Sequence, residues 1–200
     1  VTPSVAPAVS ISASSTNICN GASVTFTASP TNGGTTPAYQ WKVNGNNVGT
    51  NSATFTTTTL SNNDVVTVVL TSNATCAVPS SATSNSLTIT VGSNATPTIV
   101  INTSGTSVCA GSNVTFNANI TNGGSNPAYQ WKVNGNNAGT NSASFTTNSL
   151  ANGAVVSCVL TSNASCVTQT TANSNNITMT VSPVVTPSTT ISATATTICA

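Results

Sequence analysis

The stretch TNGGTTPAYQWKVNGNNVGTNSATF, at residues 31–55, decides the fold of this chain. Within it, Tyr39, Trp41 and Val43 are apolar and alternate with polar neighbours. This period of two predicts a β-strand with one buried face. The Asn-Gly pair at 44–45 follows directly, and Asn-Gly is the strongest short signal for a hairpin turn.

The alternation continues through the surrounding sequence. It recurs in Val24–Phe26–Ala28, Val66–Val68–Leu70 and Leu87–Ile89–Val91. Turn-forming residues separate these runs, and no stretch has the helical period. Many short strands with frequent turns predict an antiparallel β-sandwich or barrel.

The whole pattern then repeats. Residues 121–145, TNGGSNPAYQWKVNGNNAGTNSASF, match residues 31–55 at a distance of 90 without a gap. We therefore predict a tandem all-β protein with a period of 90 residues. The predicted domains are repeat 1 at 1–90, repeat 2 at 91–180 and the start of a third, truncated repeat at 181–200, with Pro-bearing linkers at 91–98 and 181–188.

Charged residues are almost absent. The 200 residues contain Lys42, Lys132 and Asp64 but no Arg, Glu or His, whereas about 25% of an ordinary chain is charged. General acids, bases and metal ligands come mostly from the missing types, so we predict that the chain is not an enzyme and binds no cofactor or metal. The net charge of +1 leaves no basic patch for nucleic acid. No apolar run approaches the ~20 residues of a membrane helix.

Several motifs carry a resemblance to a known family. Gly21-x-x-Val24-x-Phe26 is similar to the second strand of an immunoglobulin-like domain, and Tyr39-Gln40-Trp41 to its third strand. The segment from Leu60 to Val66 is similar to the corner before its sixth strand, although Ala154 replaces Asp64 in the second copy. The repeats resemble the immunoglobulin-like and PKD-like repeats of secreted surface proteins and adhesins of gliding Gram-negative bacteria. The resemblance covers nearly the whole chain and implies tandem immunoglobulin-like β-sandwiches in an extracellular setting.

Trp41 and Trp131 stand on the apolar side of this alternation. We predict that they are core residues between the two sheets. The alternative is that they are exposed platforms on which sugars stack.

The six cysteines fall into two groups. Cys158 stands where the first copy has Val68, on the inward side of its strand, so we predict a buried, unpaired thiol. The other five repeat with the period: Cys19, Cys109 and Cys199 share one position, and Cys76 and Cys166 share another.

The repeating cysteines are expected to be oxidised in an extracellular protein. In the immunoglobulin-like fold, Cys19 and Cys76 would lie at opposite ends of a strand about 17 Å long, whereas bridged Cα atoms lie within about 7 Å. We therefore favour an inter-repeat disulfide, Cys19–Cys166, and expect Cys109 to pair with a cysteine after residue 200. The alternative is pairing inside each repeat, Cys19–Cys76 and Cys109–Cys166.

Candidate glycosylation sites are numerous. Asn-x-Ser/Thr sequons begin at Asn73, Asn94, Asn102, Asn113, Asn119, Asn163 and Asn176. Candidates for O-linked sugar are Thr56, Thr57, Thr58, Thr59, Thr186, Ser188, Thr189 and Thr190. Chance produces many sequons in a chain this rich in Asn and Thr. A bare surface this poor in charge favours association, so we predict that part of these residues carry glycans.

These observations predict a structural repeat of an extracellular, glycosylated bacterial surface fibre or stalk. Its partners would be neighbouring repeats or chains of the same protein, together with covalent glycans. The alternative is an adhesin or carbohydrate-binding module displayed in tandem, with a site in the loops at 31–37 or 71–80. A threonine array that binds ice is a third hypothesis.

Overall fold

The computed structural model describes residues 3–192. The described chain is all-β and forms two compact units. Unit 1 comprises Val1–Thr96 and Ala164–Thr168, and unit 2 comprises Pro97–Asn163 and Gln169–Ala200. Unit 1 therefore takes a five-residue segment from the second sequence repeat.

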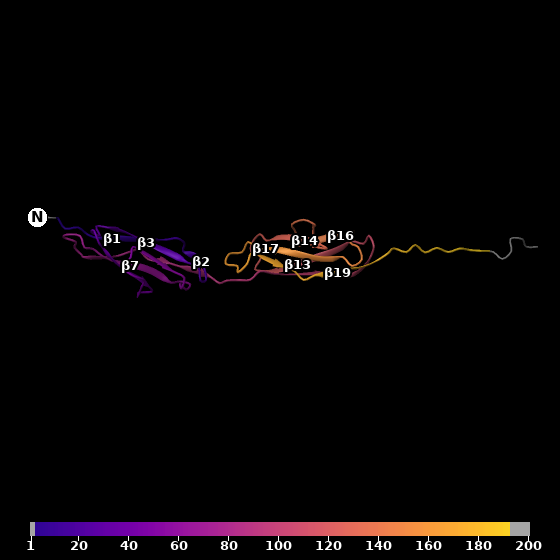
Figure 1. Ribbon diagram of the computed structural model, residues 1–200, viewed down its shortest axis with the longest axis horizontal. Helices are drawn as coiled ribbons and strands as arrows, with labels where there is room; N and C mark the ends of the chain where they lie inside the picture. Colours follow the sequence, from indigo (N-terminus) through magenta and orange to yellow (C-terminus); the bar gives the residue numbers. More distant parts are fainter. Residues whose placement is uncertain (1–2, 193–200) are drawn as a thin grey trace, which may run out of the picture. The chain divides into compact units, whose positions relative to one another are not determined.

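Unit 1 is a sandwich of two antiparallel sheets (Figure 1). The first sheet has the order β1-β3-β6, with β1 at Ala8–Ala13, β3 at Val24–Thr31 and β6 at Thr54–Thr57. The second has the order β5-β4-β7-β8, with β9 also paired to β7; these are β4 (Ala38–Val43), β5 (Asn46–Val48), β7 (Val65–Thr71), β8 (Ser81–Thr83) and β9 (Leu87–Thr88). A short parallel pair joins β2 (Asn17–Cys19) to β10 (Thr90–Gly92).

The inward faces of the two sheets form one apolar core. Phe26 from one sheet meets Trp41 from the other, with ring centroids 6.1 Å apart, and Phe55 completes an aromatic cluster. The alternate residues of β7, Val66, Val68 and Leu70, are completely buried. The period of two therefore sorts apolar side chains into the core as predicted.

Unit 2 repeats this architecture strand for strand, each strand lying 90 residues after its counterpart. Its strands are β11 (Thr98–Thr103), β12 (Ser107–Cys109), β13 (Val114–Thr121), β14 (Ala128–Val133), β15 (Asn136–Ala138), β16 (Ser144–Thr147), β17 (Val155–Thr161), β18 (Thr171–Asn173), β19 (Ile177–Thr178) and β20 (Thr180–Ser182). The prediction of tandem immunoglobulin-like sandwiches with a period of 90 is confirmed. Residues 193–200 of the expected third repeat lie outside the described residues.

The hairpin between β4 and β5 depends on its Asn-Gly pair. Asn44 and Gly45 have φ angles of +51° and +82°, the left-handed region that the two central residues of a type I′ turn require. The Asn44 side chain also accepts a hydrogen bond from the Val65 backbone N–H, at 2.9 Å, and thereby ties the turn to β7.

The turn before β7 differs between the two repeats. The Asp64 carboxylate accepts hydrogen bonds from the Ser61 backbone N–H (2.8 Å) and the Asn44 side-chain amide (2.7 Å), so it orders this turn. In unit 2 the same position holds Ala154, which is buried and has no carboxylate, and the backbone bond from Ala154 N to Ala151 O closes the turn.

Candidate functional site: the Cys19–Cys166 disulfide

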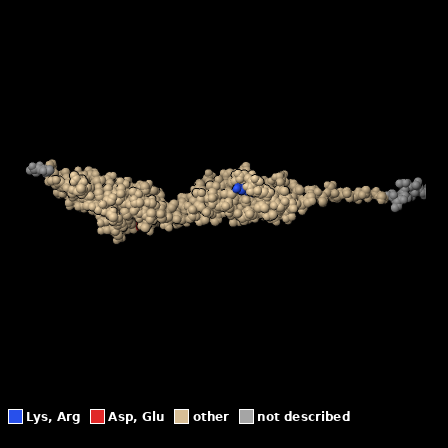
Figure 2. All heavy atoms as spheres, viewed as in Figure 1, with Lys and Arg blue, Asp and Glu red and all other residues tan. Residues whose placement is uncertain are grey.

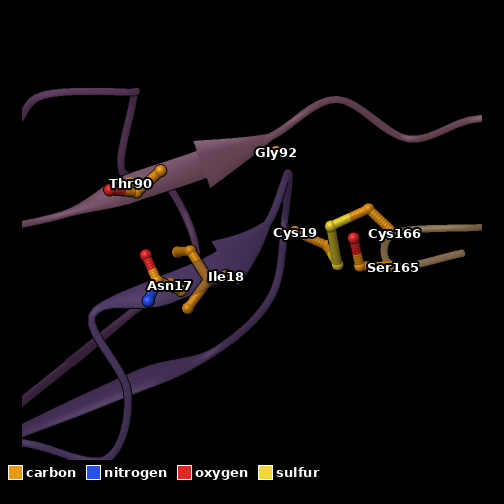
Figure 3. A pocket seen from close by; sticks show the side chains of 7 residues that line it. All are labelled: Asn17, Ile18, Cys19, Thr90, Gly92, Ser165 and Cys166. Atoms are coloured by element: carbon orange, nitrogen blue, oxygen red, sulfur yellow. A yellow bond between two sulfur atoms is a disulfide. The ribbon is translucent and has the colours of Figure 1, made fainter. Parts of the chain in front are cut away.

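Cys19 and Cys166 form a disulfide in unit 1, although they stand 147 positions apart in the sequence. Their Cα atoms lie 5.1 Å apart, inside the range of about 4.4–6.8 Å that a disulfide allows. Figure 3 shows the two side chains joined through their sulfur atoms. The bond ties repeat 1 to the segment that repeat 2 contributes to this unit.

Backbone pairing fixes the position of Cys19. It ends β2, which runs parallel to β10, and its register partner is Gly92. The next residue, Asn20, donates its backbone N–H to Gly92 O at 3.0 Å. The side chain of Asn94 in turn donates to Asn20 O at 3.2 Å.

A second set of hydrogen bonds holds Cys166. The backbone N–H of Ala95 donates to Cys166 O at 2.9 Å, and Thr168 donates back to Ala95 O at 2.8 Å. The hydroxyls of Thr96 and Thr168 lie 2.9 Å apart. Cys166 itself has a φ of +58°, which is uncommon for a residue with a side chain. The segment 164–168 is thus held by backbone pairing as well as by the sulfur bond.

Gly92 leaves room for the disulfide. A Cβ atom at this position would lie 2.9 Å from the sulfur of Cys166, closer than such atoms come in proteins. A comparison of the two repeats does not reveal this role, because the second repeat carries Ser182 at the same position. The pairing of Ala95 with the loop around Cys166 was also missed, since two isolated backbone bonds leave no pattern in the side chains.

The Cys19–Cys166 disulfide and the backbone pairing around Gly92 and Ala95 are called the joint below. Two hollows lie next to this joint. The first, of about 240 Å³, borders the disulfide (Figure 3) and is lined by Asn17, Ile18, Cys19, Thr90, Gly92, Ser165 and Cys166. The second, of about 420 Å³, is lined by Asn20, Ser61, Asn62, Val91, Gly92, Ser93 and Asn94. Neither lining contains a charged residue or a free thiol, so neither offers a general acid, a base or a nucleophilic sulfur.

The other cysteines are not bonded in the described part of the chain. Cys76 and Cys109 are exposed thiols, so the alternative pairs Cys19–Cys76 and Cys109–Cys166 are not formed. Cys158 is completely buried in the core of unit 2, and burial raises the pKa of its thiol to about 11. Cys199 lies outside the described residues.

The aromatic residues are core residues or pack against the core. Trp41 and Trp131 are fully buried, and their indole N–H groups donate to the backbone oxygens of Ser52 (2.9 Å) and Ser142 (2.8 Å). All eight aromatic side chains lie in the described part of the chain, and none of them is exposed. Neither tryptophan can therefore act as a surface platform for sugars.

The seven sequon asparagines are all exposed, but their side chains differ in what they bind. The Asn73 side chain accepts a hydrogen bond from the Thr36 backbone N–H at 3.0 Å and donates one to the Thr36 hydroxyl. The Asn163 side chain accepts from the Asn126 backbone N–H at 2.9 Å, and the Asn94 side chain donates to Asn20 O. The other four make no side-chain hydrogen bond within residues 3–192: Asn102, Asn113, Asn119 and Asn176. In repeat 1 all four positions are serine, namely Ser12, Ser23, Ser29 and Ser86.

The candidate O-linked sites lie in two segments. In β6 and the turn after it, Thr56 shares a hydrogen bond with Thr25 (2.9 Å) and Thr57 shares one with Thr59 (3.0 Å). Thr56, Thr58 and Thr59 are exposed, whereas Thr57 is half-buried. The second group, Thr186, Ser188, Thr189 and Thr190, is exposed and lies in no strand.

The described surface carries very little charge. Lys42, Lys132 and Asp64 are its only charged side chains within residues 3–192, and the face drawn in Figure 2 is almost entirely uncharged. No cluster of three metal-ligating side chains occurs among residues 3–192. The same residues include no helix of the length and apolarity needed to cross a membrane.

Comparison with known proteins gives similarity at the level of the fold. No protein-family model and no curated protein matches the chain. Three N-terminal domains of the bacteriophage RB49 highly immunogenic outer capsid protein (Hoc) are similar to it, at 14% identity over 88% of this chain and 59% of that chain, with a TM-score of 0.40. Murine CEACAM1b is similar at 15% identity over 86% of this chain and 99% of that chain, with a TM-score of 0.40. The fibronectin(III)-like modules of Clostridium thermocellum CbhA are similar at 11% identity over 86% of this chain and 92% of that chain, with a TM-score of 0.38.

Proposed function

We propose that this chain is a structural segment of an extracellular, glycosylated bacterial surface fibre or stalk, in which the Cys19–Cys166 disulfide carries tension past the folded cores. The disulfide is the observation that supports the proposal. Disulfides persist in oxidising compartments such as the cell exterior and are rare in the cytosol.

The covalent topology gives the bond a mechanical role. When the two ends of the chain are pulled, the shortest covalent path runs from residue 19 through the sulfurs to residue 166. The loop between them, which contains strands β3 to β17, lies off this path. At about 3.4 Å per extended residue, the bond withholds about 500 Å of contour length.

Glycosylation is the second part of the proposal. The four unengaged sequon asparagines of repeat 2 replace four serines of repeat 1, and each is exposed with its amide available. Glycans there would hydrate a surface that has almost no charge to keep it soluble. Attachment at Asn73 or Asn163 would instead disturb the loop hydrogen bonds of those side chains.

The alternative function, an adhesin or sugar-binding module, finds less support. Sugar sites commonly use aromatic faces, and every aromatic side chain here is buried or half-buried. The loops at 31–37 and 71–80 are tied together through Asn73, whose amide bonds to Thr36.

Single-molecule force spectroscopy on the 200-residue chain, pulled from its ends, tests the load path. We expect the oxidised chain to detach from the force probe before the loop closed by the disulfide is extended. The chain in reductant, or the Cys19→Ser variant, should extend about 500 Å further before it detaches. Cys158→Ser, which removes a buried thiol outside the joint, is the matched control and should behave as the unmodified chain. Equal extension of the oxidised and reduced chains would refute the load-bearing role.

A further inference from the structure

We propose that Cys76 and Cys109 are the two complementary halves of a second joint, and that they close an intermolecular disulfide between two copies of this chain. The inference deepens the proposed function, because it assigns the partner through which a segment would be extended. It rests on the equivalence between each half and the joint that is already closed at Cys19–Cys166.

The Cys76 half reproduces the Cys166 side of the closed joint. Val5 donates its backbone N–H to Cys76 O at 3.0 Å, and Val78 donates back to Val5 O at 2.9 Å. These are the same two bonds that Ala95 makes around Cys166. The φ angle of Cys76 is +61°, against +58° for Cys166, so the thiol is presented in the same backbone conformation.

The Cys109 half reproduces the Cys19 side. Cys109 ends β12, which runs parallel to β20, and its register partner is Ser182. Ala110 donates its backbone N–H to Ser182 O at 2.8 Å, as Asn20 does to Gly92. Cys109 and Cys76 are both exposed, whereas the bonded Cys19 and Cys166 are half-buried.

The closed joint also fixes which repeats can supply the missing partners. It links a cysteine at position 19 of one repeat to a cysteine at position 76 of the following repeat. By the same rule, Cys76 takes a cysteine at position 19 of a repeat, and Cys109 takes a cysteine at position 76 of a repeat. A second copy of this chain carries both kinds of cysteine and can place its Cys76 against Cys109 of the first copy.

The bond forms by thiol–disulfide exchange with a small disulfide such as oxidised glutathione. The thiolate of one cysteine attacks a glutathione sulfur, and one glutathione thiolate leaves. The thiolate of the second cysteine then attacks the mixed disulfide and displaces the other glutathione. Two cysteine thiols are oxidised, the small disulfide is reduced to two thiols, and the two protons pass to the departing thiolates.

One residue predicts how the second joint differs from the first. Ser182 stands where Gly92 leaves room for the sulfur of Cys166, and a Cβ at that place would come within 2.9 Å of the sulfur. The second joint must therefore shift to close. Removing the side chain with Ser182→Gly should make closure easier.

Two half-blocked chains test the proposal. Both carry Cys199→Ser, one adds Cys109→Ser and keeps Cys76, and the other adds Cys76→Ser and keeps Cys109. They carry different mass tags and are mixed in equal amounts in a glutathione redox buffer. Random pairing of two exposed thiols gives as much heterodimer as the two homodimers together. We expect about a tenfold excess of heterodimer, the ratio that about 1.4 kcal/mol of preference produces, and a further increase with Ser182→Gly in the chain that keeps Cys109.

A heterodimer fraction at the random value, or an excess of either homodimer, would overturn the proposal. An excess that Ser182→Gly abolishes would overturn the equivalence of the two joints. The existing joint is read separately in the same samples, because trypsin cuts only after Lys42 and Lys132. An intact Cys19–Cys166 bond links fragment 1–42 to fragment 133–200, so a failure of the new joint is distinguishable from a failure of the proposed function.

Discussion

Removing the disulfide with Cys19→Ser should destabilise repeat 1 strongly. The bond closes a loop of 147 residues, and a cross-link of this length restricts the unfolded chain far more than the folded one. The chain-entropy relation for such a loop gives about 17 cal/mol/K, or about 5 kcal/mol at 25 °C. Measured effects commonly reach about 2–4 kcal/mol, because unfolded chains retain some structure. A loss of this size would lower the melting temperature of a domain of this size by about 10–30 °C.

The buried tryptophans allow the effect to be assigned to one repeat. Trp41 reports on the core of unit 1, and Trp131→Phe leaves it as the chain's only tryptophan. Fluorescence-monitored thermal unfolding of this variant, with and without Cys19→Ser, measures the change. Cys166→Ser should produce the same loss as Cys19→Ser, and the double variant should add nothing further, because both single variants break one bond.

The outcome that would refute this reasoning is a small or additive effect. If Cys19→Ser lowers stability by less than about 1 kcal/mol, the loop is already restricted in the unfolded chain. If the two single effects add, each cysteine acts through its own local contacts. Cys76→Ser, at the equivalent but unbonded position, is the matched control and should leave the transition unchanged.

Three further changes have defined outcomes. Gly92→Ala crowds the disulfide sulfur and should make the bond easier to reduce by about 1–3 kcal/mol, measured by a glutathione titration. Gly105→Ala is the control, because its added Cβ meets no atom within 4 Å, and it should leave the ease of reduction unchanged. Asp64→Ala removes two hydrogen bonds to a carboxylate and should lower the free energy of unfolding of repeat 1 by about 1–2 kcal/mol, measured by urea denaturation. A larger loss would contradict a purely local role for Asp64. Burial raises the pKa of Cys158 to about 11, so above pH 9 the unfolded chain loses this proton first and repeat 2 should lose stability as the pH rises. Cys158→Val should remove that dependence, and if it persists another group is responsible.

The sequence was sufficient to predict the sandwich. Alternation in Val66–Val68–Leu70 and the turn pair at 44–45 report directly on burial and on backbone conformation, and the structure follows both. The 90-residue period then extends the argument to the second unit without new information. The short strand β2 was not predicted, because three residues are too few to establish a period. The alternating run Leu87–Ile89–Val91 was predicted as one strand, whereas the structure divides it into β9 and β10.

The site was less accessible to sequence reasoning. Cysteine positions and strand directions favoured Cys19–Cys166, which is the pair that the structure joins. The left-handed conformation of Cys166 and the open space at Gly92 depend on contacts between segments far apart in the chain. No local propensity encodes such contacts, and the serine at position 182 conceals the glycine's role from a comparison of the repeats.

The scarcity of charge determines which condition can control this joint. The chain has no histidine, one acid and two lysines, so almost no side chain changes its charge between about pH 5 and 8. Interactions between so few charges also leave salt with little to screen. Neither pH in this range nor ionic strength should change the free energy of unfolding by more than about 0.5 kcal/mol. The redox potential is different, because it determines whether Cys19–Cys166 is closed and whether Cys76 and Cys109 can pair. Melting curves at pH 5 and pH 8, each with and without reductant, separate the effect of pH from the effect of the redox potential. A pH effect as large as that of the reductant would contradict this conclusion.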